Sequence, residues 1–178
     1  MPVIVTYEEF VRIALNAMED LVESGVAELT EQGHVDTGEG VRSLEVEILE
    51  KGKEKLRLAI KGNDYLLDLD QGVPPDKVDL SAEAEQKMLA WAARRRPALS
   101  DSNRRRFVFL VMNKAAIVGY PLDGAYLYTK NGRRTGWIDA GIEKNVEQIF
   151  EVQYAIFELL GNNFEGLMQS LIDDAKKV

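Results

Sequence analysis

The sequence predicts an α+β fold: a long N-terminal helix packed on a small antiparallel β-sheet, with further helices and a projecting β-hairpin arm. Apolar residues recur at three- and four-residue spacing over residues 10–29, which is the period of a helix with one buried face. Polar and apolar residues then alternate over 44–48 and over 56–60, as in strands with one solvated face. The later patterns are mostly helical and do not alternate regularly with strands, so a parallel sheet is not expected.

A capping motif opens the first predicted helix. The Thr6 side chain can accept a hydrogen bond from the amide of Glu9, and the Glu9 side chain can reach back to Thr6. The helix is expected to run to about Gln32, with Gly33 as its terminator. The apolar stripe between these ends consists of Phe10, Ala14, Ala17, Met18, Leu21, Val22, Val26 and Leu29.

The two alternating segments are predicted to form an antiparallel hairpin, because the short charged segment EKGKEK joins them. A third short strand is expected over 65–70, where YLLDLD follows a turn-forming segment. The adjacent prolines that follow Gly72 exclude regular structure in QGVPPDKVD.

Two helices are predicted next in the chain. The first begins at a cap on Asp79 or Ser81 and stops before Pro97. The second begins at a cap on Ser100 or Asp101 and ends at Gly119. The residues expected to be buried are Met88, Leu89 and Trp91 in the first helix and Phe107, Leu110, Val111 and Ile117 in the second.

The segment 120–137 is predicted to form the hairpin arm. Asn131-Gly132 is a strong two-residue turn signal because both residues tolerate positive φ, and strand-like AYLYTK and RRTGWI flank it. A two-stranded arm of this length is only marginally stable alone, so it must pack on the body or be ordered by a partner chain. The aromatic and cationic residues of this segment are Tyr126, Tyr128, Lys130, Arg133, Arg134 and Trp137.

A helical segment over 139–178 completes the chain, with a break expected at Gly161-Asn162-Asn163. The length of 178 residues suits a single domain, so residues 1–178 are expected to form one α+β domain that carries the arm.

Composition and charge argue against several classes of function. The chain is 46% apolar and 29% charged, as in ordinary soluble globular proteins, and it has no cysteine, which excludes thiol chemistry and thiolate metal sites. The net charge of −8 argues against general nucleic-acid binding, which needs a basic face. No signal peptide or membrane-spanning stretch is recognised, so no membrane partner is expected.

Arginines nevertheless cluster in two places that are close in the sequence, at 94–96 and at 104–106. This pattern fits a basic patch that meets an acidic neighbour. It fits equally a solvated helix end followed by a loop.

The triplet Asp36-Thr37-Gly38 has the residues of an aspartic-protease signature. In those enzymes the triplet lies in a buried turn, and two carboxylates share a proton. Here it follows the polar end of a helix and precedes a half-exposed strand. The favoured interpretation is a structural turn in which Asp36 or Thr37 bonds the backbone two residues on and Gly38 supplies the required torsion angles. A carboxylate-dependent hydrolase that uses Asp36 is the alternative.

The remaining motifs for catalysis or binding are weak. Asp68, Asp70 and Gly72 resemble the start of a calcium loop, but the glycine comes one position early and Asp79 stands where the loop needs a glutamate. Gly72 is therefore interpreted as a turn residue. His34 is the only histidine, so catalytic triads and histidine metal clusters lack their parts. We predict no catalytic, cofactor-binding or metal site, and no enzyme activity.

Taken in order, several segments resemble the tail-completion or neck proteins of tailed bacteriophages, also described as minor tail or virion-morphogenesis proteins. Members carry an Asp-Thr-Gly turn and then an Arg-Ser pair before the first strand, which residues 36–38 and 42–43 match. A tyrosine, an acidic residue and a glycine follow in the family, and Tyr65, Asp70 and Gly72 match them, although the acid is more often Glu. The segments MLAWAARRR, FVFLVMNKAAIVGYP and GWIDAGIEKN resemble the later helices of the family.

This likeness covers roughly residues 33–160, and it rests on the order of the segments because no single motif is highly specific. It implies a small α+β protomer that forms a homo-oligomeric ring at the head-to-tail joint or at the upper end of the tail, with no catalytic duty. The hairpin arm and the long C-terminal helical segment are larger than the family pattern. These departures leave open which neck position the protein occupies.

The resemblance also implies partners and a location. The partners are other neck or tail proteins, such as a connector or stopper and a tail terminator or tube, and DNA passes the ring lumen without specific binding. The location is the virion, with assembly in the host cytoplasm. A monomeric adaptor whose basic helix ends bind an acidic partner is a further alternative. The residues expected to contact neighbouring subunits or partners are Arg104, Arg105, Arg106, Tyr126, Tyr128, Arg133, Arg134 and Trp137.

Overall fold

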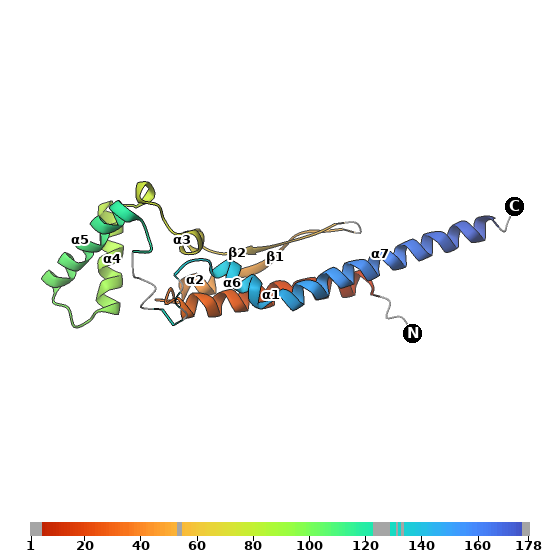
Figure 1. Cartoon of the computed structure of the whole chain (residues 1–178), viewed down its shortest axis with the longest axis horizontal. Coiled ribbons are helices and arrows are strands. Elements are labelled where there is room, and N and C mark those ends of the chain that lie inside the picture. The colour runs from red at the N-terminus through yellow and green to blue at the C-terminus, as the bar shows by residue number, and fades with distance from the viewer. Residues whose placement is uncertain (1–4, 53–54, 123–128, 131, 133, 176–178) are drawn as a thin grey trace. The chain divides into compact units, whose positions relative to one another are not determined.

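The computed structural model describes residues 5–52, 55–122, 129–130, 132 and 134–175 (Figure 1). Over these residues the predicted α+β class is confirmed, with a long N-terminal helix, an antiparallel hairpin and further helices. The chain divides into two compact units. Unit 1 comprises residues 1–26, 43–62 and 139–178, and unit 2 comprises 27–42 and 63–138.

The first helix, α1, spans Tyr7–Glu31. Its N-terminus has the predicted cap, since the Glu9 amide donates to Thr6 Oγ1 at 3.2 Å. Gly33 follows the helix with a φ of 73°, the left-handed conformation that a glycine terminator adopts. In unit 1 the buried apolar residues of α1 are Val11, Ala14 and Ala17.

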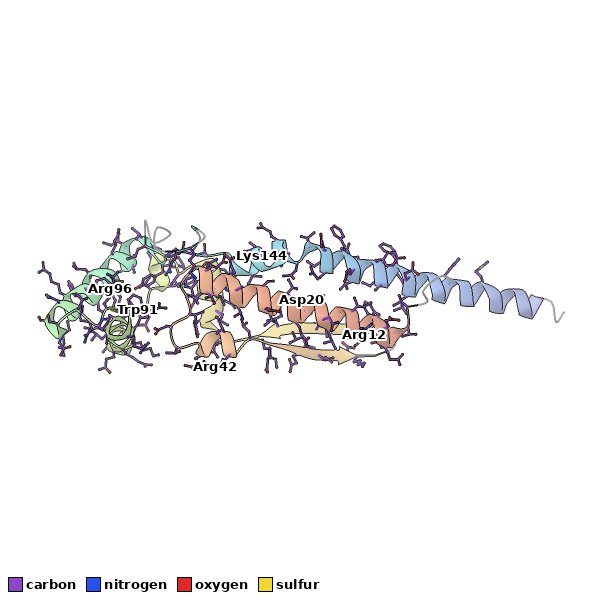
Figure 2. All side chains as sticks on the ribbon, turned by 90° about the horizontal axis from the view of Figure 1, so that it is seen from below. Arg12, Asp20, Arg42, Trp91, Arg96 and Lys144 are labelled. Carbon is purple, nitrogen blue, oxygen red and sulfur yellow. The ribbon has the colours of Figure 1, made fainter. Side chains whose placement is uncertain are left out.

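Strands β1 (Glu45–Lys51) and β2 (Leu56–Lys61) form the predicted hairpin in unit 1. Val46 pairs with Ile60, and a register shift lies between Ile48 and Glu50. The hairpin lies beside α1 in both views (Figures 1 and 2). The two strands therefore supply a narrow sheet against one side of the helix.

Helices α6 (Trp137–Lys144) and α7 (Val146–Ala175) complete unit 1 from residue 139 onward. A Cβ built on Gly141 would lie 3.5 Å from the backbone nitrogen of Gly25, so α6 approaches α1 closely where both residues are glycine. Between the two helices the buried Asn145 side chain donates to the Gly141 carbonyl at 2.8 Å. α7 runs along α1 and continues past it (Figure 2).

The break predicted at Gly161-Asn162-Asn163 is wrong, because α7 continues through these residues. Glycine in a helix interior costs only about 1 kcal/mol relative to alanine, and asparagine costs less. That penalty is too small to interrupt the backbone hydrogen bonds of a long apolar helix.

Unit 2 contains two short helices and a 3₁₀ turn: α2 (Glu39–Arg42), α3 (Tyr65–Gln71) and η1 (Pro75–Lys77). The third strand predicted over 65–70 is thus wrong, since these residues form α3. Leucine is a strong helix former, and six residues of weak alternation are too few to separate the period of a strand from that of a helix.

Helices α4 (Ala82–Arg95) and α5 (Asp101–Val118) form a helical hairpin in unit 2. Ser81 and Ser100 cap their N-termini by accepting from backbone amides three residues on, at 3.2 and 3.5 Å. Trp91 of α4 stacks on Phe107 of α5 with ring centroids 6.5 Å apart. The buried centre of this packing consists of Ala92, Val108 and Met112.

The predicted buried face of α5 is wrong at two positions. Leu110 is 57% exposed and Ile117 is 76% exposed, while Val108, Met112 and Ala115 are buried. Apolar residues occur on both sides of α5, so their spacing alone does not select the face that packs on α4.

Only part of the predicted hairpin arm can be compared with the structure, because residues 123–128, 131 and 133 are not among the described residues. Within the described part, Tyr120 and Val73 form an isolated antiparallel bridge. The return strand expected to reach Trp137 is not found there, since Trp137 and Ile138 begin α6. Within the described ranges no helix is both long and apolar enough to cross a membrane.

Candidate functional site

The turn between α1 and α2 carries the Asp-Thr-Gly triplet, and it joins the C-terminal end of α4 in unit 2. Asp36 Oδ2 accepts hydrogen bonds from Arg94, including one from Nε at 2.8 Å. Arg95 Nε lies 3.3 Å from Asp36 Oδ1. The hydrogen bonds from Arg94 and the positive charge of both arginines hold the pKa of the Asp36 carboxyl below its usual value. The carboxylate therefore stays ionised and paired at neutral pH.

The backbone of the same turn is bound by side chains at both of its ends. Arg95 Nη2 donates to the carbonyl of Val35. Arg42 Nη2 donates to the Thr37 carbonyl at 3.2 Å, and Thr37 Oγ1 accepts from the Glu39 amide at 3.4 Å. Thr37 thus bonds the backbone two residues on, while the Asp36 side chain reaches across to α4.

Glycines shape the corner where this turn meets α3. Gly38 has a φ of 75°, which residues with a side chain rarely adopt. Gly40 is buried against the hydroxyl of Tyr65, so a Cβ at this position would overlap that oxygen. Glycine at positions 38 and 40 therefore allows the backbone of this turn to lie close to the side chains of Arg42 and Tyr65.

The end of α1 binds the segment that precedes α6. The buried Gln32 side chain donates to Glu28 Oε1 at 2.9 Å and to the Thr135 carbonyl at 3.2 Å. Arg134 Nη1 donates to the Gln32 carbonyl at 2.7 Å, and the Lys130 amide donates to the Glu31 carbonyl. These bonds tie residues 130, 134 and 135 to the end of α1 within unit 2.

His34 lies in the same group of contacts. Its Nε2 donates to the Arg134 carbonyl at 2.8 Å, because a carbonyl oxygen can only accept. Burial lowers the pKa of His34, and the charge of Arg134 lowers it further, while the hydrogen bond opposes the shift. The ring is therefore a neutral structural donor at neutral pH.

Trp137 and Asp70 join the start of α6 to α3. The indole Nε1 of Trp137, which is 7% exposed, donates to the Leu66 carbonyl at 2.9 Å. Asp70 Oδ1 accepts from the Ile138 amide at 2.8 Å. A carboxylate at this place satisfies a free amide of the first helical turn. Asp70 thus caps a helix, although its segment resembles a calcium loop in sequence.

A cleft of about 670 Å³ lies beside the Asp36 turn within unit 2. Several polar groups in its wall already have partners, since Asp36 binds Arg94, Asp79 accepts from the Ser81 amide, and Lys87 pairs with Glu83. The apolar part of the wall includes Leu66, Val73, Met88, Trp91 and Met112.

The residues expected at subunit contacts fall into different environments. Arg105 and Arg106 are exposed on α5. Arg104 pairs with Asp101 at 2.8 Å and donates to the Leu99 carbonyl, so it supports the start of its own helix. Arg134 and Trp137 bind carbonyls of unit 2. Tyr126, Tyr128 and Arg133 lie outside the described residues.

The structure places Trp137 in the core instead of on an exposed arm. An aromatic residue beside arginines has the composition of an interface centre, and it has equally the composition of a buried residue that binds a carbonyl.

Sequence analysis does not predict the pairing of Asp36 with Arg94 and Arg95. The sequence shows only an acidic residue in a turn and, about 60 residues later, a run of arginines.

Charged and polar contacts thus join the α1–α2 turn to α4, the end of α1 to the segment before α6, and α3 to the start of α6. No group of three or more His, Cys, Asp or Glu residues suited to a metal ion is found among the described residues. Comparison of the chain with models of known protein families, with curated proteins and with solved structures finds no match.

Proposed function

We propose that this protein is a structural subunit of a tailed-bacteriophage particle, which forms a homo-oligomeric ring at the head-to-tail joint or at the upper end of the tail. The ordered likeness of residues 33–160 to neck and tail-completion proteins supports this assignment. The contacts of Asp36 with Arg94 and Arg95 then serve to stabilise the protomer. Its carboxylate is bound by two arginines and has a lowered pKa, which suits a structural tie better than a proton donor.

The observation that carries the proposal is the surface of α7. Phe150 is 61% exposed and Phe157 is 73% exposed in the single chain. Soluble monomers rarely leave a long contiguous apolar stripe in water, and such a stripe marks a surface that another protein covers. An assembly subunit accounts for this surface, because its neighbours in the assembly bury it.

A genetic experiment tests the proposal in the cells that carry this gene. Deleting the gene is expected to leave filled heads and free tails that fail to join, and supplying the chain from a plasmid is expected to restore joined particles. A plasmid that encodes the chain with an early stop codon is the matched control. Normal numbers of joined, infectious particles in the deletion strain would overturn the proposal.

A further inference from the structure

Helix α7 has two apolar faces, and the protomer covers only one of them. The inner face includes Ala155, which is buried, and Ile149, Val152 and Leu159, which are half-buried. The opposite face carries large apolar residues at three- and four-residue spacing, and all of them are exposed. These residues are Val146, Phe150, Tyr154, Phe157, Leu160, Phe164 and Met168, and we call them the α7 stripe.

The size and the spacing of the α7 stripe support its assignment as a binding surface. An aromatic side chain buries about 150–250 Å² when it is covered, so the four aromatic residues together expose on the order of 500 Å². Patches of a few hundred Å² already mark functional surfaces on monomers. Phe150, Phe157 and Phe164 recur every seven residues, which is the spacing with which one helix packs along another.

A second surface of the same chain has matching features. On α5, Phe109 is 63% exposed and Ile117 is 76% exposed, and Leu110 is exposed as well. Arg105 and Arg106 belong to the same face, because they precede Phe109 by four and three residues. We call Arg105, Arg106, Phe109, Leu110 and Ile117 the α5 face.

The charges of the two surfaces are opposite. Residues 146–175 contain no lysine or arginine, and Glu147 and Glu151 are exposed next to the α7 stripe. The single acid of α5, Asp101, already pairs with Arg104. Neither Arg105 nor Arg106 has an ion-pair partner among the described residues. Two acidic α7 helices side by side would repel each other, whereas an α7 helix and an α5 helix attract.

We propose that the α7 stripe of one copy packs on the α5 face of the next copy, so that Glu147 and Glu151 lie near Arg105 and Arg106. This inference rests on the proposed function, since it names the contact that builds the ring. The two surfaces are unlike, so the contact is heterologous, and repeating such a contact generates a ring or an open filament instead of a closed dimer. An α5 helix of 18 residues is about 27 Å long, which is enough to follow the α7 stripe for several turns.

The test uses two single substitutions that each destroy one surface. Phe157→Glu places a charge in the centre of the α7 stripe, and Ile117→Glu does the same on the α5 face. Both side chains are exposed in the protomer, so neither variant is expected to lose its fold. Leu80→Glu is the matched control, since Leu80 is 55% exposed and lies on neither surface.

Sedimentation velocity of the full chain, from micromolar to near-millimolar concentration, gives the readout. Wild type and Leu80→Glu are expected to self-associate with the same affinity, and each of the other two variants to weaken self-association by roughly 30-fold or more. An equal mixture of Phe157→Glu and Ile117→Glu is expected to form dimers and nothing larger. Each such dimer keeps one intact contact and ends in two damaged surfaces.

Three results would overturn the inference. If wild type associates but the mixture stays monomeric, or if only one variant is defective, the α7 stripe does not bind the α5 face. If wild type is monomeric throughout, another copy does not cover the stripe on its own. The deletion experiment on particles is independent of these three results, so failure of this contact and failure of the proposed function can be told apart.

Discussion

Asp36 and Arg94 are 58 residues apart in the sequence, and their side chains bind each other in unit 2, with Arg94 Nε 2.8 Å from Asp36 Oδ2. Arg95 approaches the other carboxylate oxygen and also donates to the Val35 carbonyl. The turn after α1 is therefore tied to the end of α4 through one carboxylate.

We expect Asp36→Asn to lower the free energy of unfolding by on the order of 1 kcal/mol, because a partly exposed ion pair with two arginines is lost. Urea unfolding at neutral pH measures the change. Asp76→Asn is the control, since Asp76 is exposed in η1 and has no ion pair among the described residues. An Asp36→Asn protein that keeps full stability but loses a hydrolytic activity of the wild type would contradict the structural interpretation. That result would support the alternative of a carboxylate-dependent hydrolase.

Gly72→Ala is expected to destabilise the protein by at least about 2 kcal/mol, since it combines an unfavourable backbone angle with a steric clash. Gly72 has a φ of 78°, and its added Cβ would lie 2.7 Å from the carbonyl oxygen of Tyr120. Gly136→Ala separates the two effects. Its φ of 72° is similar, but nothing lies within 4 Å, so only the backbone cost of about 1 kcal/mol remains. Thermal unfolding of both variants gives the comparison, and equal losses would show that the clash is relieved.

Trp137→Phe is expected to cost roughly 1–3 kcal/mol of stability, because the Leu66 carbonyl loses a buried donor. The loss is expected to be the same at every protein concentration, since the contact lies within one protomer. Trp91→Phe is the control, because its ring stacks on Phe107 and an aromatic replacement keeps that contact. A Trp137→Phe protein that is fully stable but fails to associate would instead place Trp137 at a subunit contact.

The lowered pKa of His34 predicts that the protein loses stability when the pH falls below about 6.5. Burial holds its folded-state pKa below the ordinary value of about 6.5, so the unfolded chain binds the proton more readily. Stability is therefore fully present above that value and falls as the pH drops through it. His34→Gln, which keeps a side-chain donor, is expected to flatten the unfolding free energy between pH 7 and the onset of carboxylate titration. The same slope in both proteins would rule out His34 as its source.

The features that the sequence predicts well are local ones. The sequence predicts the Thr6 cap, and it narrows the other two caps to adjacent or nearby candidates that include Ser81 and Ser100, because a cap requires only a short polar side chain and the next three residues. The hairpin of β1 and β2 was found for the same reason, since its pattern and its turn are adjacent in the chain.

The features that the sequence does not predict depend on distant partners. The packed face of α5 depends on the position of α4, and the spacing of its apolar residues allowed another face. The ion pair of Asp36 with Arg94 requires a fold that brings a turn to a helix end, and nothing near either residue signals it. Composition alone predicts an interface position for Trp137, because it does not distinguish an interface from a core.

The position of the protein in the particle can be determined by electron microscopy of purified particles in which this chain is labelled at one terminus by a small tag and a gold-conjugated probe. We expect several labels on each particle, gathered at the head-to-tail joint or the upper end of the tail. Particles without label, together with a chain that remains in the cytoplasm as a single subunit, would contradict the proposed function.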